Sequence, residues 1–135
     1  ALGALVTVRG KVWKDVGIDA MVVSWDTEGW HRPQQHAIGR LFVDTRWLSR
    51  FPRGNFGFLA WVQGEYRPES PFPVADGAAY STQNRILSFH IEVRIVDAVL
   101  TWQLRNAAPL RETQVPGFFV PGPMQLYGVR WTFWN

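Results

Sequence analysis

Three histidines have the widest chemical range in this sequence, because an imidazole can bind a metal or transfer a proton near neutral pH. His31 and His36 are five residues apart, and His90 lies far along the chain. A metal centre would need these rings to converge, together with Asp26 or Glu28. Because His31 and His36 fall in or beside a predicted long loop, we interpret them as exposed polar residues and predict no metal site.

The acidic residues form no pattern typical of catalysis. Asp15 and Asp19 flank a predicted tight turn, where aspartate bonds to nearby backbone groups. Asp26 and Glu28 stand at a predicted strand end with no partner that would hold them as an acid–base pair. Phosphate-binding glycine loops, the zinc-protease motif and the serine-hydrolase elbow are all missing from the sequence. We therefore predict no catalytic residue, no cofactor and no enzymatic activity.

One short run combines opposite charges with a histidine. His90, Glu92 and Arg94 alternate with apolar residues, so they share one face of a predicted strand. Opposite charges two residues apart more often form an ion-pair ladder along a sheet than a ligand site. We interpret the three residues as such a ladder, with ligand contact as the alternative.

Two further groups could contact a partner. Arg50 and Arg53 lie in a short predicted turn, where we favour solvated charge over contact with phospholipid headgroups. Phe118 and Phe119 lie in a predicted long loop, where they could touch a ligand or pack against the loop itself.

The composition narrows the class of protein. The chain has 135 residues, of which 47% are hydrophobic and 19% charged, so it is not intrinsically disordered. It has no cysteine, which excludes disulfides and thiolate chemistry. Its net charge of +3 comes from scattered residues, and we predict no nucleic-acid partner. Eight tryptophans suit a surface that is apolar on one side and wet on the other, such as a membrane interface.

The elements that must position these residues are strands, because hydrophobic residues recur with a period of two. The clearest run is 87–95, in which Leu87, Phe89 and Ile91 begin an apolar face that continues to Ile95. A second run, 98–105, follows after a very short link and predicts a hairpin. The same alternation recurs through most of the chain, and we predict seven strands, at about 4–13, 18–27, 37–48, 55–67, 86–96, 98–106 and 124–134.

The connections between these strands alternate in length. Short ones lie near 14–17, 49–54 and 97, and long ones near 28–36, 68–85 and 107–123. Eight of the nine prolines fall in the long ones, where they do not interrupt a ladder. Short turns at one end and long loops at the other are typical of outer-membrane β-barrels. A closed bacterial barrel has an even number of strands, so we expect the chain to be the C-terminal part of a larger barrel.

The C-terminal residues carry a more specific pattern. In Tyr127-Gly128-Val129-Arg130-Trp131-Thr132-Phe133, the apolar side chains Tyr127, Val129, Trp131 and Phe133 share one face of a predicted strand. The segment resembles the insertion signal that the barrel-assembly machinery of the outer membrane recognises. It departs from the commonest form because Trp134 and Asn135 follow the last aromatic of the motif.

A wider stretch is similar to the end of a TonB-dependent outer-membrane receptor. The similarity covers about 86–135, and the motifs that carry it are Val96-Asp97-Ala98-Val99-Leu100, Trp102-Gln103-Leu104-Arg105-Asn106, Val115-Pro116-Gly117-Phe118, Pro121-Gly122 and Tyr127-Gly128-Val129-Arg130-Trp131. It is loose over 1–85 and departs at Pro123, where the family often has arginine.

The resemblance implies an all-β fold in which 1–135 is an antiparallel, up-and-down transmembrane segment, the last seven or so strands of a 22-stranded barrel. It also implies outer-membrane localisation and TonB-dependent uptake of a scarce ligand such as a siderophore, vitamin or glycan. The implied partners are outer-membrane lipid, the barrel-assembly machinery and the rest of the receptor chain, whose plug connects it to TonB. His90, Glu92 and Arg94 would then face the lumen.

Two alternatives belong to other classes. A soluble β-sandwich or barrel could bind carbohydrate through exposed tryptophans, if its apolar faces were buried in its own core. A small stand-alone outer-membrane barrel with a structural or adhesive role would need an eighth strand or a pairing of two copies.

Overall fold

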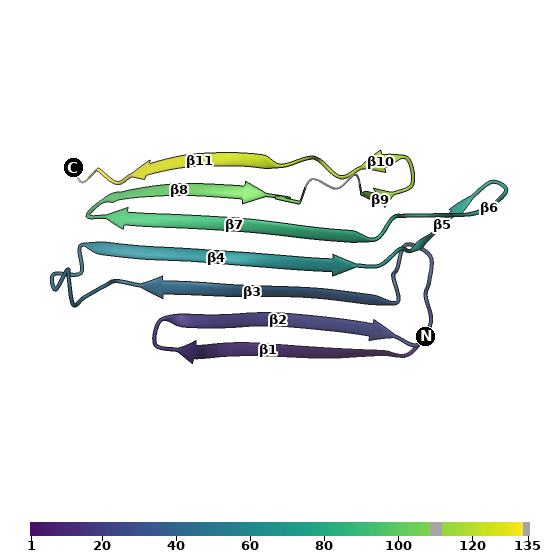
Figure 1. Ribbon diagram of the computed structural model, residues 1–135, viewed down its shortest axis with the longest axis horizontal. Coiled ribbons are helices and arrows are strands. Elements are labelled where there is room, and N and C mark those ends of the chain that lie inside the picture. The colour runs from purple at the N-terminus through teal and green to yellow at the C-terminus, as the bar shows by residue number, and fades with distance from the viewer. Residues whose placement is uncertain (109–111, 134–135) are drawn as a thin grey trace.

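The computed structural model describes residues 1–108 and 112–133 and consists of strands, turns and loops (Figure 1). Seven long strands form one antiparallel sheet in the order β1-β2-β3-β4-β7-β8-β11, so each long strand pairs with the next one along the chain. Their bounds are β1 Gly3–Trp13, β2 Val16–Trp25, β3 Gln35–Thr45, β4 Phe56–Arg67, β7 Asn84–Ile95, β8 Ala98–Arg105 and β11 Met124–Trp131. The sheet does not close on itself, because β1 and β11 are both edge strands.

The two ends of the sheet differ (Figure 1). At one end, which we call the turn end, β1 meets β2 and β7 meets β8 through very short links, and residues 46–55 join β3 to β4. At the other end, which we call the loop end, the connections are long. Two of them contain small hairpins, formed by β5 (Pro71–Val74) with β6 (Gly77–Tyr80) and by β9 (Thr113–Val115) with β10 (Phe118–Phe119).

The link between β7 and β8 is fixed by its neighbours. Val96 has a φ of 54°, which is unusual for a β-branched residue. Its N–H donates to the carbonyl of Asn55 at 2.8 Å, and the carbonyl of Asp97 accepts the N–H of Thr132 at 3.1 Å. Contacts with the β3–β4 turn on one side and the end of β11 on the other therefore hold this turn in place.

The strands are staggered. Val16 is the first residue of β2, and successive cross-strand partners place it level with Ile91 of β7. β7 extends beyond this level to Ile95 before it turns. At the loop end, Leu104 near the end of β8 pairs with Phe89, whereas β7 begins at Asn84. Both ends of the sheet therefore shift in the same direction from one strand to the next.

The prediction of an all-β chain with seven antiparallel strands is confirmed, with ends shifted by up to about three residues. The last strand was predicted to run to 134 but ends at Trp131, because its partner Ala98 is the first residue of β8. Residue 134 lies outside the described residues. The four short strands β5, β6, β9 and β10 were not predicted.

Candidate functional site

One face of the long sheet is apolar along its whole width. Residues that pair directly across antiparallel strands project from the same face, so the registers assign each paired residue of the long strands to one of two faces. Among the charged residues of the seven long strands, only Arg85 lies on the apolar face, and it stands near the loop end. Central side chains of this face are Leu41, Val62, Phe89, Ile91, Val93, Leu100, Trp102 and Val129.

The apolar face is not covered by other parts of the described chain. Val129 is 72% exposed, and among the described residues only Phe72 and Val99 are buried hydrophobic side chains. The accessible surface is 9757 Å². That is about a third more than the roughly 7,200 Å² expected for a folded soluble monomer of this mass. The sheet therefore presents a large exposed apolar surface, of the kind that marks a contact with another protein or with a membrane.

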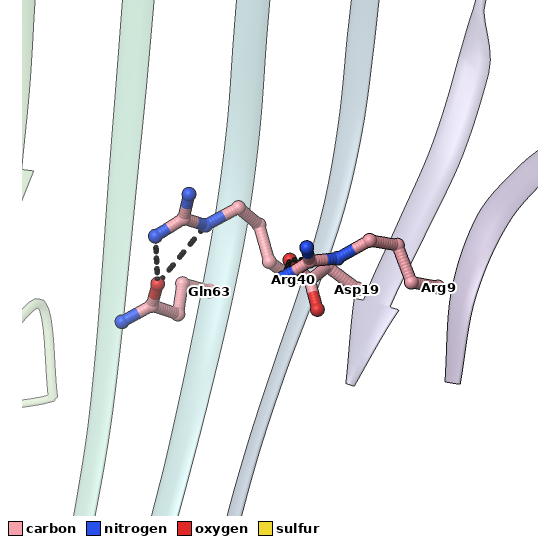
Figure 2. A network of polar contacts seen from close by, with 4 residues as sticks. All are labelled: Arg9, Asp19, Arg40 and Gln63. Atoms are coloured by element: carbon pink, nitrogen blue, oxygen red, sulfur yellow. Dashed lines mark hydrogen bonds and ion pairs between the residues drawn. The ribbon is translucent and has the colours of Figure 1, made fainter. Parts of the chain in front are cut away.

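The opposite face carries the remaining strand charges and a row of polar contacts that crosses four strands (Figure 2). Arg9 of β1 pairs with Asp19 of β2 at 2.9 Å. Arg40 of β3 lies opposite Asp19 and donates two hydrogen bonds, 3.0 and 2.6 Å long, to the side-chain oxygen of Gln63 on β4. Two polar pairs, one between β1 and β2 and one between β3 and β4, thus stand side by side across the sheet.

Trp61 interrupts the polar pattern of β4, and the structure accounts for it. Its ring lies on the polar face, with the guanidinium of Arg40 4.8 Å from the ring centroid. On its other neighbour strand, His90 stacks against it with ring centroids 5.2 Å apart and an interplanar angle of 9°. A tryptophan in this position extends the polar row from β3 to β7, because its π face attracts the cation and stacks on the imidazole.

The three residues predicted to share a face, His90, Glu92 and Arg94, all lie on the polar face. Glu92 and Arg94 form an ion pair at 3.6 Å, whereas His90 contacts Trp61. Together with Asp44 and Leu59, the Glu92–Arg94 pair lines a polar groove of about 250 Å³ at the turn end. The predicted ladder therefore exists as one ion pair, and His90 belongs to the tryptophan row.

The C-terminal motif forms the outer edge of the sheet. Tyr127, Val129 and Trp131 lie on the apolar face, opposite Trp102, Leu100 and Ala98 of β8. Gly128 lies on the polar face, where a Cβ atom would collide with the hydroxyl of Thr101. Phe133 lies beyond the end of the strand, yet its ring stacks on Trp131 with centroids 6.0 Å apart. The motif therefore places an exposed aromatic pair at the turn end.

Comparisons with known protein families, with curated proteins and with solved structures found no match. Within residues 1–108 and 112–133, no helix is long and apolar enough to cross a membrane.

The residues considered for metal binding lie apart or are paired with other groups. His36 contacts Glu65 at 2.9 Å, and His31 packs edge-on against Phe72 with centroids 4.7 Å apart. Asp26 accepts a hydrogen bond from the N–H of Leu2 at 3.0 Å, which lowers the pKa of this carboxyl below its usual range. Over the part of the chain that the structure describes, no three histidines or acidic residues are grouped as metal ligands would be.

A cluster of buried polar residues at the loop end was not predicted from the sequence. Ser70 and Ser81 join the two ends of the β5–β6 hairpin, with the N–H of Ser70 donating to the Ser81 hydroxyl at 3.0 Å. Asn84 donates to the carbonyls of Thr82 and Thr113, which lie in different connections. Glu112 accepts the N–H of Arg85 at 2.8 Å. These contacts fasten the connections 68–83 and 106–123 to each other and to the start of β7. Serine and threonine in a loop give no sequence signal for such burial.

Proposed function

We propose that the chain is the C-terminal, seven-strand part of an outer-membrane barrel of the TonB-dependent receptor type. The observation that carries the proposal is the division of the sheet into two faces, one uncharged over nearly its whole width and the other charged. In a barrel wall the uncharged face contacts lipid and the charged face lines the lumen. Such a wall segment contributes to the uptake of a scarce ligand when it is combined with the rest of its receptor.

The dimensions of the sheet support this proposal. The central strands β3, β4 and β7 have 11, 12 and 12 residues. Strands of about 9–11 residues, tilted by about 45°, cross a bilayer. The turn end shifts by about four residues across four strand spacings, between the β1–β2 and β7–β8 turns. At about 3.3 Å per residue and 4.8 Å per spacing, this slope is about 35°, which lies within the tilt range of closed barrels.

The two open edges support a larger assembly. Backbone groups on the free sides of β1 and β11 would be unpaired in lipid, and each would cost several kcal/mol. Additional strands that pair with both edges remove this cost. In the proposed receptor these strands belong to the same polypeptide, and the plug that connects the receptor to TonB fills the lumen. His90, Glu92 and Arg94 then face that lumen, and Tyr127–Phe133 present the assembly signal.

The soluble carbohydrate-binding alternative receives less support. It requires a second layer over the apolar face, and none of the described elements provides one. The exposed tryptophans Trp13, Trp30, Trp47 and Trp131 lie on four different strands or connections, and Trp30 stands at the loop end, away from the other three, whereas a sugar site would gather them in one groove.

The first test is to read the coding DNA immediately upstream of the codon for Ala1. We expect an open frame of several hundred codons that encodes further alternating strands and a plug. A start codon or a secretion signal directly before Ala1 would contradict the receptor proposal and favour a small barrel or a soluble binder.

A second test uses the C-terminal aromatics in the full-length protein. Because they form the proposed assembly signal, Trp131→Ser with Phe133→Ser should abolish insertion into the outer membrane, measured as the yield of folded barrel in membrane fractions. The matched control replaces two equally exposed aromatics of the long connections, Trp30→Ser with Phe118→Ser, and should leave the yield unchanged. Normal yield from the C-terminal variant would contradict the role of the motif.

A further inference from the structure

The turn between β3 and β4 carries an aromatic cluster that the wall of a barrel does not need for its own structure. Phe51 stacks on Phe56 with ring centroids 4.7 Å apart and an interplanar angle of 19°. Trp47 lies 6.2 Å from Phe51 and 6.0 Å from Phe56. The three rings form one compact group, and Trp47 is still 55% exposed.

Backbone hydrogen bonds give this turn a definite shape. The carbonyl of Trp47 accepts the N–H groups of Arg50 and Phe51 at 2.9 and 3.0 Å, and the carbonyl of Phe51 accepts the N–H of Gly54 at 2.9 Å. Gly54 has a φ of 66°, a conformation that suits glycine. Arg50 and Arg53 therefore project from a folded turn rather than from a loose loop.

The cluster lies at the rim of the apolar face. Phe56 pairs with Ile95, whose partner Ala98 pairs with Trp131, so all four side chains share that face. Trp131 with Phe133 forms a second aromatic pair at the same end of the sheet. This end therefore presents aromatic rings at the level where a bilayer changes from hydrocarbon to headgroups.

The charge at this end is basic. The turn-end connections 14–15, 46–55 and 96–97 contain four basic and two acidic residues, whereas the loop-end connections 26–34, 68–83 and 106–123 contain two basic and five acidic residues. Arg50 and Arg53 are exposed, and within the described residues neither side chain forms an ion pair or a hydrogen bond. Arg46 of the same turn differs, because it lines the polar groove with Asp44 and Glu92.

We propose that Arg50 and Arg53, with the ring cluster of Trp47, Phe51 and Phe56, form a binding site for the headgroups of anionic phospholipids. The rings hold the turn at the interface, and the guanidinium groups bond to lipid phosphate through paired N–H donors. The site rests on the proposed function, because it needs the apolar face to lie in a membrane. The occupant is the lipid itself, held by its acyl chains along the apolar face and by its phosphate at the turn.

The test measures lipid binding by the full chain in micelles of a neutral detergent. Short-chain phosphatidylglycerol, short-chain phosphatidylcholine and inorganic phosphate are titrated in turn and followed by calorimetry at low salt. We expect phosphatidylglycerol to bind and the other two to bind far more weakly. Each basic side chain near an anionic lipid surface contributes a factor of about five, so Arg50→Gln with Arg53→Gln should weaken phosphatidylglycerol binding about 25-fold.

The matched control removes the same charge at the same end of the sheet but on the polar side. Arg46→Gln with Arg94→Gln should change phosphatidylglycerol binding less than threefold. The proposed site would be wrong if both double variants lost phosphatidylglycerol binding equally, or if the Arg50 and Arg53 variant lost none. Phosphate binding as tight as that of phosphatidylglycerol would mean a small-anion site instead. A chain that is folded and monomeric without detergent would contradict the proposed membrane function, an outcome distinct from these.

Discussion

Gly128 shows how closely side chains of the last two strands approach each other. A Cβ atom at this position would collide with the hydroxyl of Thr101, its cross-strand partner. We predict that Gly128→Ala lowers the free energy of unfolding by about 1 kcal/mol, because overpacking outweighs the backbone entropy that alanine saves. The measurement is a urea titration of the chain refolded in detergent micelles, followed by circular dichroism.

A second variant separates this clash from a general loss of strand propensity. Thr101→Ala removes the hydroxyl that the new methyl group would meet, so the double variant Gly128→Ala with Thr101→Ala should be at least as stable as the parent chain. If the double variant is as unstable as Gly128→Ala alone, the contact with Thr101 is not the reason for glycine at this position.

The hydrogen bond between Asp26 and Leu2, the residue before β1, depends on pH. The N–H of Leu2 donates to its carboxylate at 3.0 Å, and this bond lowers the pKa of Asp26 from 3.8. A lowered pKa means that the stabilisation is present above the unfolded-state value and is lost as pH falls through the lower folded-state value. We predict that the Leu2 amide shift, followed by NMR, titrates with a midpoint below 3.8. Asp26→Asn should remove the transition, and a midpoint at or above the usual value would contradict the coupling.

For individual residues, the sequence predicted the face of the sheet on which a side chain lies better than it predicted the side chain's contacts. Alternation alone placed His90, Glu92 and Arg94 together. The contact of His90 with Trp61 depends on the register of β4 against β7, which alternation does not specify. The deviation of Trp61 from the apolar–polar pattern was the available signal that the polar face holds an aromatic group.

At the level of strands, prediction succeeded because most of the long strands carry a two-residue period of their own. β5, β6, β9 and β10 are too short for a period to appear, and they bury few side chains. β5 also contains Pro71 and Pro73, which argue against a strand in a sequence. In a two-stranded ribbon, prolines two residues apart place both missing N–H groups on the same side, which is compatible with an open edge.

The two faces of the sheet should respond in opposite ways to charge. Ile91→Arg places a guanidinium in the middle of the apolar face, where a bilayer would impose a cost of about 2–4 kcal/mol. Thr101→Arg places the same group on the polar face opposite Glu92 and should cost little. We predict that only Ile91→Arg lowers the stability of the full-length protein refolded in lipid vesicles, measured by urea titration.

The reverse ranking would be informative. If Thr101→Arg were the more destabilising change, the charged face would be the one that meets an apolar environment, and the assignment of lumen and lipid would be inverted. Equal small effects would mean that both faces contact water, as in a soluble sheet.

The whole molecule has an excess of apolar surface and two unpaired edges. Folding normally buries enough apolar area to offset the conformational entropy of the chain. Here the sheet is held by inter-strand hydrogen bonds and by a small polar cluster at the loop end, while the large apolar side chains of its central strands remain uncovered. Under the proposed function, such a sheet gains its stability from a hydrophobic surrounding and from neighbouring strands. Neither is visible from composition, because the alternating pattern averages to a neutral hydropathy.

This dependence yields a prediction for the 135-residue chain by itself. In buffer without detergent it should associate through its apolar face and edges, whereas in neutral detergent micelles it should form β-structure with bound detergent. Sedimentation velocity with and without detergent, combined with circular dichroism, measures both properties. A folded monomer of 15.5 kDa in plain buffer would require a buried apolar face. It would therefore contradict the membrane proposal and return the chain to the class of soluble β-domains.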